Sequence, residues 1–392
     1  MTGSLAGAAA IAGIGQTEFS KESGRSELQL ACEAVSAALD DAGVAPGDVD
    51  GMVTFTMDAS DEIAVARNVG IGDLNFFSRV PHGGGAAAGT VAHAAMAIAT
   101  GVADVVVCYR AFNERSGLRF GGSGRTSSET PLFMAHYAPF GLLTPAAWVA
   151  LHAQRYMSAY GVTNEHFGAI AVVDRAHAAR NPDAWFYQRP ITLADHQNSR
   201  WIVEPVLRLL DCCQESDGGV ALVVTSTQRA RDLRQAPAVI TAAAQGAAAE
   251  GEMMTSYYRD DITGLPEMGV VARRLWRDSG LKPADIQTAF LYDHFTPFVF
   301  VQLEELGFCG RGEAKDFATV ENLSLGGALP INTNGGLLGE AYIHGMNGIT
   351  EAVRQVRGTS CNQVDGVEHV LVTSGTGVPT SGLILAPGRV SA

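Results

Sequence analysis

The chain is poor in lysine and lacks paired metal-binding cysteines, and each shortage argues against a class of function. Lys21, Lys282 and Lys315 are its three lysines among 392 residues, and the formal net charge is −14. A nucleic-acid partner requires a basic face, so this composition argues against one. The six cysteines include no Cys-x-x-Cys pair, which argues against a zinc site.

Basic leader residues and long apolar runs are missing too. Residues 1–11 are apolar without a preceding basic residue, so we expect a first strand there and no signal peptide. Residues 84–100 are uncharged and small, but this run contains His93 and is shorter than a typical membrane span. We therefore expect a buried helix, no membrane partner, and a cytoplasmic protein with reduced thiols.

The chain contains an internal duplication. Residues 41–55 resemble residues 278–292 without a gap. Each copy follows an amphipathic helix, expected over 26–42 and 269–279, and each continues with a glycine, a Pro-x-Asp turn and an apolar strand. This pattern predicts an α/β fold built from two similar halves.

The same order of elements follows in each half. Gly83-Gly84-Gly85 precedes the small-residue helix and a strand over 104–109, and Gly335-Gly336 precedes a helix over about 340–357 and a strand over 369–373. We place the first half at 1–230 and the second at 231–392. An insertion over about 113–211, with helices near 145–160 and 165–180, belongs to the first half.

A glycine-rich signature occupies the second half: Asn332-Thr-Asn-Gly335-Gly336, four residues, then Ala341-Tyr342-Ile-His344-Gly345-Met-Asn-Gly348. It resembles the C-terminal signature of the thiolase superfamily, Asn-x-x-Gly-Gly, four residues, Gly-His-Pro-x-Gly-x-x-Gly. The resemblance implies a thiolase fold, with two duplicated βαβαβαββ halves in five αβαβα layers, and an acyl-CoA ligand. It also makes Asn332, Gly335 and Gly336 candidate residues for binding the substrate or CoA. Tyr342 stands where that family has its catalytic histidine.

The other reactive positions of thiolases are changed as well. Counting back along the first helix from Ile98 puts the nucleophilic cysteine position at Gly84, in Pro81-His82-Gly83-Gly84-Gly85. The histidine of the His-Asp-Cys-Phe motif corresponds to Tyr292, in Tyr292-Asp293-His294-Phe295, and the second cysteine corresponds to Thr373. We expect the remaining cysteines to lie away from these motifs, so an acyl-enzyme has no nucleophile.

Two tyrosines at positions of proton chemistry predict acid–base catalysis on a β-hydroxyacyl-CoA. One phenolate would take the hydroxyl proton, the bond between the α and β carbons would break, and the second tyrosine would protonate the enolate. The phenolate would require stabilisation by His294, His344 or a helix N-terminus, because a free phenol has a pKa of about 10. We assign Tyr342 as the base, since a helix start is expected near it, and Tyr292 as the acid; the reverse order stays open.

The supporting residues have alternative interpretations. The Gly83-Gly84-Gly85 backbone or His82 would donate to the enolate oxygen, although His82 is equally a structural loop residue. Asp293 either orients a neighbour or forms a turn. His344 is expected to face away from Tyr342 if both lie on a helix. The lysines lie in polar, turn-like segments, which argues against a Schiff base, and the histidines form no recognisable metal set.

Longer runs resemble one group in the superfamily, the lipid-transfer-protein-like aldolases of actinobacterial sterol side-chain degradation. These runs are residues 101–117, 195–201, 210–218, 265–269, 292–297 and 339–348. The resemblance implies cleavage of a 17-hydroxy-3-oxo-pregnene-20-carboxyl-CoA to a 17-keto steroid such as androstenedione and propionyl-CoA. A non-catalytic acyl-CoA or sterol carrier and a residual acetyl-CoA acyltransferase are the rival functions.

The same resemblance implies ligands and partners. CoA is part of the substrate, and no cofactor is bound permanently. The partners are a second copy of the chain, giving a homodimer, and the OB-fold and zinc-ribbon domain of a hydratase subunit. The insertion would cover the CoA, where Arg115, Arg119 and Arg125 would meet its phosphates; a solvated loop is the alternative.

Overall fold

A computed structural model describes residues 5–81, 83–117, 119, 134–252, 256–375 and 380–388. Its main sheet has nine strands in the order β3-β2-β4-β7-β1-β8-β11-β10-β9. Their bounds are β1 Ala9–Gln16, β2 Gly51–Phe55, β3 Phe76–Val80, β4 Val105–Asn113, β7 Asp217–Ser226, β8 Ala238–Gly246, β9 Thr288–Phe290, β10 Val370–Ser374 and β11 Thr380–Pro387. A separate hairpin pairs β5 (Trp201–Val203) with β6 (Leu207–Arg208).

The sheet consists of two halves joined at its centre. Strands β3, β2 and β4 pair in parallel, as do β9 and β10, whereas the remaining pairs are antiparallel. β1 and β8 connect the halves through Ala10 opposite Val239 and Ile11 opposite Ala238. Because the chain leaves the first half at β7 and enters the second at β8, the predicted duplication corresponds to these two halves.

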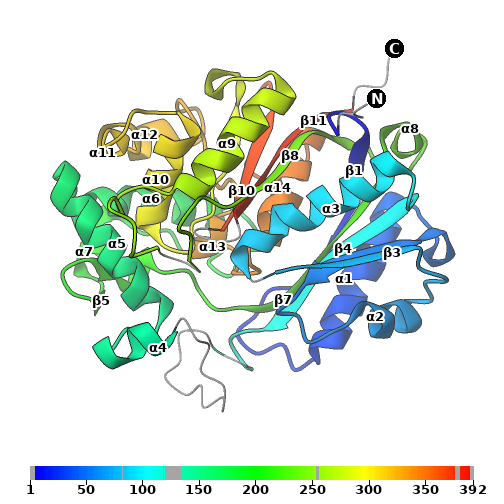
Figure 1. Cartoon of the computed structure of the whole chain (residues 1–392), viewed down its shortest axis with the longest axis horizontal. Helices are drawn as coiled ribbons and strands as arrows, with labels where there is room; N and C mark the ends of the chain where they lie inside the picture. Colours follow the sequence, from blue (N-terminus) through cyan, green and yellow to red (C-terminus); the bar gives the residue numbers. More distant parts are fainter. Residues whose placement is uncertain are drawn as a thin grey trace.

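Helices cover both sides of this sheet and lie between its halves. α1 (Glu27–Ala42) packs on β1, β4 and β7, and α9 (Pro266–Ser279) packs on β8 and β11. α3 (Ala87–Thr100) contacts strands of both halves, and α14 (Met346–Arg357) contacts α3 and strands of both halves (Figure 1). The layers are therefore the outer helix α1, the first half of the sheet, the middle helices α3 and α14, the second half of the sheet, and the outer helix α9. This order confirms the predicted five-layer arrangement. α3 is apolar on all sides because it lies in the middle layer.

The repeated segments share their local structure. α1 begins at the cap Ser26 and ends at Gly43, and α9 ends at Gly280. Both glycines have a φ of 72°, a left-handed conformation that favours glycine. The predicted helices over 26–42 and 269–279 are therefore confirmed, with α9 starting three residues earlier. In each copy a short 3₁₀ helix and a strand follow.

The insertion is largely helical in its described part. The expected helices near 145–160 and 165–180 are α5 and α6. The remaining helices are α2 Glu62–Val69, α4 Met134–Tyr137, α5 Pro145–Tyr160, α6 Asn164–Ala178, α7 Leu193–Asn198, α8 Thr227–Ala230, α10 Thr296–Leu306, α11 Ala314–Phe317, α12 Val320–Leu323 and α13 Gly336–Gly339. The 3₁₀ helices are η1 Pro46–Asp48, η2 Gly84–Ala86, η3 Ala138–Phe140, η4 Leu209–Asp211 and η5 Pro283–Asp285. In the described ranges, helices with the length and apolarity for a membrane span are absent.

One predicted helix start is wrong. The helix expected from about residue 340 begins at Met346. His344 and Gly345 have φ values of 51° and 86°, so two consecutive residues leave the right-handed helical region before α14 begins. Tyr342 therefore lies in the segment between α13 and α14, and the helix start that favoured it as the base is four residues away.

Candidate active site

The two tyrosines selected from the sequence form a hydrogen-bonded pair. Tyr292 follows β9 and Tyr342 precedes α14, yet their hydroxyl oxygens are 2.9 Å apart. The Tyr292 side chain is 2% exposed, Tyr342 is partly buried, and the two rings meet edge to face with centroids 6.3 Å apart. Each phenol has one proton, so one hydroxyl donates to the other and the remaining proton is directed elsewhere.

Both phenols are protonated in this environment. Burial raises the pKa of each well above 10, and the neighbouring Tyr292, Cys213 and Glu114 raise the pKa of Tyr342 further. The hydrogen bond with Tyr342 acts in the opposite direction on the pKa of Tyr292 but is the smaller effect. The resting site therefore contains two neutral phenols that share a hydrogen bond.

The peptide of Tyr292 is held from behind by buried polar side chains. Its N–H lies 3.0 Å from Thr373 Oγ1, and Gln302 Nε2 donates to its carbonyl at 2.8 Å. Thr373 Oγ1 in turn donates to Gln302 Oε1 at 2.6 Å. Thr373, the position matched to the second thiolase cysteine, thus fixes the main chain that carries Tyr292.

The glycine loop lies directly against the site. A Cβ atom at Gly84, the position matched to the nucleophilic cysteine, would overlap the Tyr292 hydroxyl. A Cβ at Gly83 would lie 2.8 Å from Cδ2 and 2.9 Å from Nε2 of His344. Gly85 follows in η2, and its carbonyl accepts from Ser381 Oγ at 2.6 Å. His82 lies outside the described residues.

Asp293 anchors the main chain of the signature segment. Its carboxylate is fully buried and accepts from the N–H groups of Leu337 and Leu338 at 2.9 and 3.0 Å. A Cβ at Gly336 would overlap this carboxylate, so only glycine fits there. Asn332 Oδ1 accepts from the N–H of Leu291 at 2.9 Å. These bonds hold the end of β9 against the signature, and with it Tyr292.

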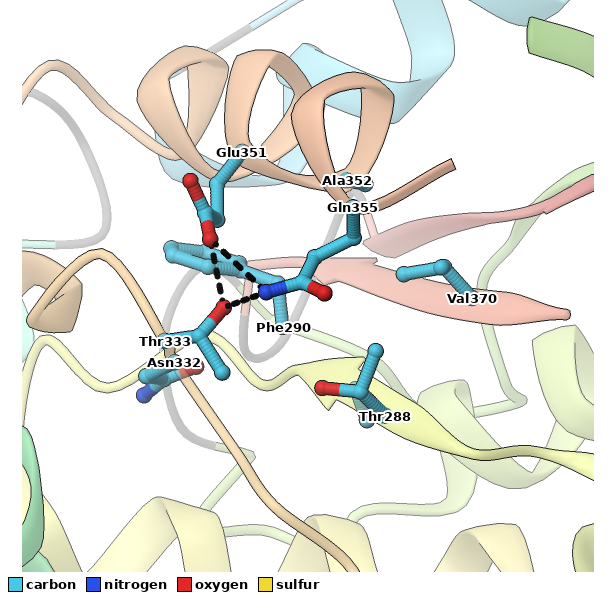
Figure 2. A pocket seen from close by; sticks show the side chains of 9 residues that line it. Thr288, Phe290, Asn332, Thr333, Glu351, Ala352, Gln355 and Val370 are labelled. Atoms are coloured by element: carbon cyan, nitrogen blue, oxygen red, sulfur yellow. Dashed lines mark hydrogen bonds between the residues drawn. The ribbon is translucent and has the colours of Figure 1, made fainter. Parts of the chain in front are cut away.

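Neighbouring parts of the signature are held in a similar way. A Cβ at Gly335, whose φ is 108°, would lie within 3 Å of Ala178. Thr333 Oγ1 donates to Glu351 Oε1 at 2.6 Å and accepts from Gln355 Nε2 at 3.0 Å. Figure 2 shows these side chains at a small cavity between β9 and α14. The signature is thus tied to both the strand and the helix of the second half.

The two histidines lie against the tyrosines. The His294 ring centroid is 5.0 Å from that of Tyr292, and the His344 centroid is 4.5 Å from that of Tyr342. The expectation that His344 faces away is wrong, because residue 344 is not helical. Burial lowers the pKa of His294 to about 3 and that of His344 well below 6.5. Both imidazoles are therefore neutral, and neither supplies the positive charge expected to stabilise a phenolate.

Two ionisable residues that the sequence analysis missed lie near the tyrosines. Arg110, on β4, has no exposed surface and forms an ion pair with buried Asp58. Glu114, just after β4, is also buried, and burial raises its pKa well above 4.5. The signal was present in the run Tyr109-Arg-Ala-Phe-Asn-Glu, where an ionisable residue interrupts an otherwise apolar strand and a second one follows its end.

A family model described as thiolase C-terminal domain-like matches residues 233–386. A steroid side-chain-cleaving aldolase of Thermomonospora curvata is 70% identical over 389 residues, which cover 98% of this chain and 99% of that protein. The chain belongs to the steroid side-chain-cleaving aldolases of the thiolase superfamily.

Two further comparisons agree with this family. A 17-hydroxy-3-oxo-4-pregnene-20-carboxyl-CoA lyase of Mycobacterium tuberculosis is 66% identical, and the match covers 97% of this chain and all of that protein. The solved structure of an Ltp2-ChsH2(DUF35) aldolase superposes with a TM-score of 0.94 at 69% identity and covers 98% of this chain and 99% of that one.

Cys213 lies beside the tyrosine pair, although we expected the cysteines to lie away from the catalytic motifs. The N–H of Cys213 donates to the carbonyl of His294 at 2.8 Å, and its side chain packs on the apolar cluster that contains Tyr292. Burial raises the pKa of its thiol well above 9, with Glu114 adding to the effect. A protonated thiol is a poor nucleophile, so its position does not restore thiolase chemistry.

We predict that acetoacetyl-CoA leaves no acyl group on the protein. The thiol of Cys213 is protonated by burial, and Gly84 has no side chain at the nucleophile position. Intact-mass spectrometry after incubation near neutral pH checks this, with Cys213→Ala as the matched control. An adduct that is present in the wild type and absent from Cys213→Ala would show that Cys213 is a nucleophile.

Two of the arginines expected near the substrate have contacts within the chain, Arg119 through its guanidinium and Arg115 through its main-chain N–H. Arg119 Nε lies 2.6 Å from Glu215 Oε2, and the N–H of Arg115 donates to Asp217 Oδ1 at 2.9 Å. Arg125 lies outside the described residues, so CoA binding by these arginines stays a prediction. Lys21 does not lie in a solvated turn: its Nζ donates to the Glu215 carbonyl at 2.5 Å, and burial lowers its pKa to about 8. Groups of three or more potential metal ligands are not found in the described part of the chain.

Glu340 holds the segment that leads to Tyr342. This fully buried carboxyl accepts from Asn181 Nδ2 at 3.0 Å and Asn347 Nδ2 at 2.7 Å, and also from Asn334. Burial raises its pKa from 4.5 to about 8. The folded protein therefore retains a proton that the unfolded chain loses above pH 4.5.

We predict that this proton makes stability fall as the pH rises from about 4.5 to about 8. The slope should approach ~1.4 kcal/mol per pH unit for one proton. Glu340→Gln, which does not titrate, should flatten the dependence. Urea unfolding of both proteins at several pH values within this range measures it. Equal slopes in wild type and variant would show that Glu340 is ionised throughout this range.

Proposed function

We propose that this chain is a retro-aldolase that cleaves a 17-hydroxy-3-oxo-pregnene-20-carboxyl-CoA into a 17-keto steroid and propionyl-CoA. The observation that carries the proposal is the contact of 2.9 Å between the Tyr292 and Tyr342 hydroxyls. The pair stands where thiolases place two catalytic histidines, and the nucleophile position is Gly84. The names of the relatives at 70% and 66% identity support the substrate class.

The pair performs this reaction as a proton relay between neutral phenols. Tyr342 Oη accepts the proton of the 17-hydroxyl as the carbon–carbon bond breaks and its electrons pass into the thioester enolate. Tyr342 gives its own proton to Tyr292 Oη, and Tyr292 gives its proton to the α carbon of the enolate. The products are the 17-ketone and propionyl-CoA, and both phenols end as they began. A resting phenolate, which burial disfavours, is not required.

The substrate also explains why a lysine is not required. The electrons of the broken bond pass into a thioester carbonyl, and an amine that attacks a thioester forms an amide instead of an imine. Lys21 lies near this region, bonded to the Glu215 carbonyl, but it has no Schiff-base role in such a reaction. CoA enters as part of the substrate, and the scheme uses no permanently bound cofactor.

The same proposal includes two protein partners. The structurally similar Ltp2-ChsH2(DUF35) aldolase supports a complex with a DUF35 domain, which we expect to have the OB-fold and zinc-ribbon form. A second copy of the chain would pack at the edge strand β3, where the Phe77 side chain is 65% exposed. Contacts between edge strands would extend the sheet across a homodimer.

The test combines the purified chain with the 17-hydroxy steroid-CoA, with and without a candidate DUF35 domain. Chromatography follows the 17-keto steroid and propionyl-CoA in equal amounts, and light scattering reports the mass of each assembly. Stoichiometric products support the retro-aldolase. Tight binding of the acyl-CoA without products, with the DUF35 domain present, would instead indicate a non-catalytic carrier.

A further inference from the structure

Arg110 is a buried charge whose position requires an explanation beyond folding. It has no exposed surface, and its Cζ lies 4.5 Å from the ring centroid of Phe112 and 5.2 Å from that of Phe55. Asp58 neutralises it, and Thr54 Oγ1 lies 2.6 Å from Asp58 Oδ2. Burial lowers the pKa of Arg110 only to about 10, so it remains charged. Apolar residues of similar volume commonly replace such buried pairs without loss of stability.

The arginine determines which nitrogen of His344 holds the proton. Arg110 Nη2 lies 3.1 Å from His344 Nδ1. A guanidinium has donors and no acceptor, so Nδ1 must accept this hydrogen bond and be unprotonated. The single proton of the neutral imidazole is then on Nε2. Doubly protonated His344 is incompatible with the contact.

The protonated nitrogen lies at the site of the reaction. His344 Nε2 would be 2.9 Å from a Cβ on Gly83, and a Cβ on the next residue, Gly84, would overlap the Tyr292 hydroxyl. The His344 ring also lies 4.5 Å from the Tyr342 ring. The imidazole and the Tyr292 phenol therefore lie against the same two-residue segment of main chain, and the Tyr342 hydroxyl contacts the Tyr292 hydroxyl there.

The backbone at His344 supports a role that is not purely structural. Its φ of 51° is uncommon outside glycine, and histidine, asparagine and aspartate are the other residues that adopt it most often. A residue held in this region is maintained by its surroundings, and such positions cluster at functional sites. Here Arg110 and the Tyr342 ring are the surroundings that hold the imidazole in place.

We propose that Arg110 is a positioning residue that holds His344 as the neutral Nε2–H tautomer, and that His344 donates this hydrogen to the enolate oxygen of the acyl-CoA. The inference rests on the proposed retro-aldolase, which requires a donor at that oxygen. A neutral donor suits the reaction because it stabilises the developing charge without transferring its proton. The charge of Arg110 polarises the imidazole and strengthens the donor.

The tautomer is tested without any substrate. Proton–nitrogen correlation spectra of the protein labelled with ¹⁵N-histidine should show a protonated Nε2 and a bare Nδ1 for His344, assigned by its loss in His344→Phe. The pattern should persist in Arg110→Lys. It should be lost in Asp58→Asn/Arg110→Met, which removes both buried charges together. A proton on Nδ1, or on both nitrogens, in the wild-type protein would overturn the inference.

The role at the enolate is tested by two reactions. One is cleavage of the steroid-CoA, and the other is exchange of the α protons of propionyl-CoA in D₂O, which forms the enolate without a steroid. His344→Phe should slow both about 100-fold or more, as loss of an oxyanion donor does, with little change in propionyl-CoA binding. The Asp58→Asn/Arg110→Met variant should behave similarly, and Arg110→Lys should lose less.

The outcomes separate this inference from the proposed function. Wild-type exchange that persists within threefold in His344→Phe would overturn the role of His344 even if cleavage is established. A wild-type protein that neither cleaves nor exchanges, with the DUF35 domain present, would overturn the proposed function and the enolate role together. In that case the spectra alone would decide the tautomer assignment. A melting temperature lowered in a variant, with normal exchange, would show that its residue is structural only.

Discussion

Replacing Tyr342 with phenylalanine is expected to lower the rate of carbon–carbon cleavage by about a thousandfold, within the range for loss of a positioned acid or base. The substitution removes one hydroxyl and keeps the ring that packs 4.5 Å from His344. It therefore breaks the relay at Tyr342 without opening a cavity. Tyr292→Phe breaks the same relay at its other member and should have a similar effect.

The double variant gives a sharper test, because the two hydroxyls are 2.9 Å apart and act as one unit. Removing the second should cost little once the first is lost, so the double variant should be about as slow as either single variant. Single-turnover formation of propionyl-CoA measures the rates, and calorimetry measures substrate binding. Tyr160→Phe is the matched control, since its hydroxyl contacts Thr263 and Arg311, away from the tyrosine pair.

Activity within tenfold of wild type in both single variants would show that the pair does not transfer protons. A loss confined to one variant would show that a single tyrosine serves as acid and base, with a solvent proton completing the reaction. Either result would leave the fold assignment intact, because the relatives at high identity and the arrangement of the layers do not depend on the hydroxyls.

The sequence was sufficient to predict the scaffold and to single out the two tyrosines whose hydroxyls lie 2.9 Å apart. The signature marked Asn332, Gly335 and Gly336 as candidate substrate or CoA contacts, which stays a prediction. In the structure Asn332 bonds to Leu291 at the end of β9, Gly336 lies against Asp293, and Gly335 lies against Ala178. The helices over 26–42 and 269–279 followed from local patterns that act within a few residues. Such short-range information survives in a single sequence because caps, turns and amphipathic faces depend on neighbours.

The surroundings of the tyrosines could not be predicted in the same way. The contact of Arg110 with His344 joins residues 234 apart in the chain, and it depends on the packing of β4 against the signature. Cys213 reaches the site because the segment before β7 forms a bridge from Glu215 to Tyr342. His344 was misplaced because a helical path was assumed through two residues with positive φ. Each error concerns long-range packing or an unusual backbone, which spacing does not encode.

Gly84→Ala should reduce cleavage almost as severely as loss of a tyrosine, by at least about a hundredfold, since small displacements of catalytic groups cost this much. An added Cβ would overlap the Tyr292 hydroxyl and ring. Tyr292 cannot simply retreat, because its peptide is held by Gln302 and its ring already lies against Gly345. The phenol must rotate, and the contact with Tyr342 is lost.

The stability of this variant should change far less than its activity. Overpacking at one position typically costs about 1–3 kcal/mol, and alanine favours the helical conformation that begins at η2 more than glycine does. Gly72→Ala is the matched control, because an added Cβ there meets no atom within 4 Å. Rates of propionyl-CoA formation and urea unfolding on the same samples separate the two effects.

A double-mutant cycle tests the cause directly. In a Tyr292→Leu background the side chain that collides with the new Cβ is gone, so Gly84→Ala should destabilise the protein less there than in wild type. Equal destabilisation in both backgrounds would show that the added Cβ does not collide with the Tyr292 side chain. A smaller destabilisation in the Tyr292→Leu background would also explain why the thiolase nucleophile is absent, because the Cβ of a cysteine at position 84 would overlap Tyr292 in the same way. A cysteine at position 84 and a tyrosine at position 292 then exclude one another, and the exchange of nucleophile for phenol is a single structural change.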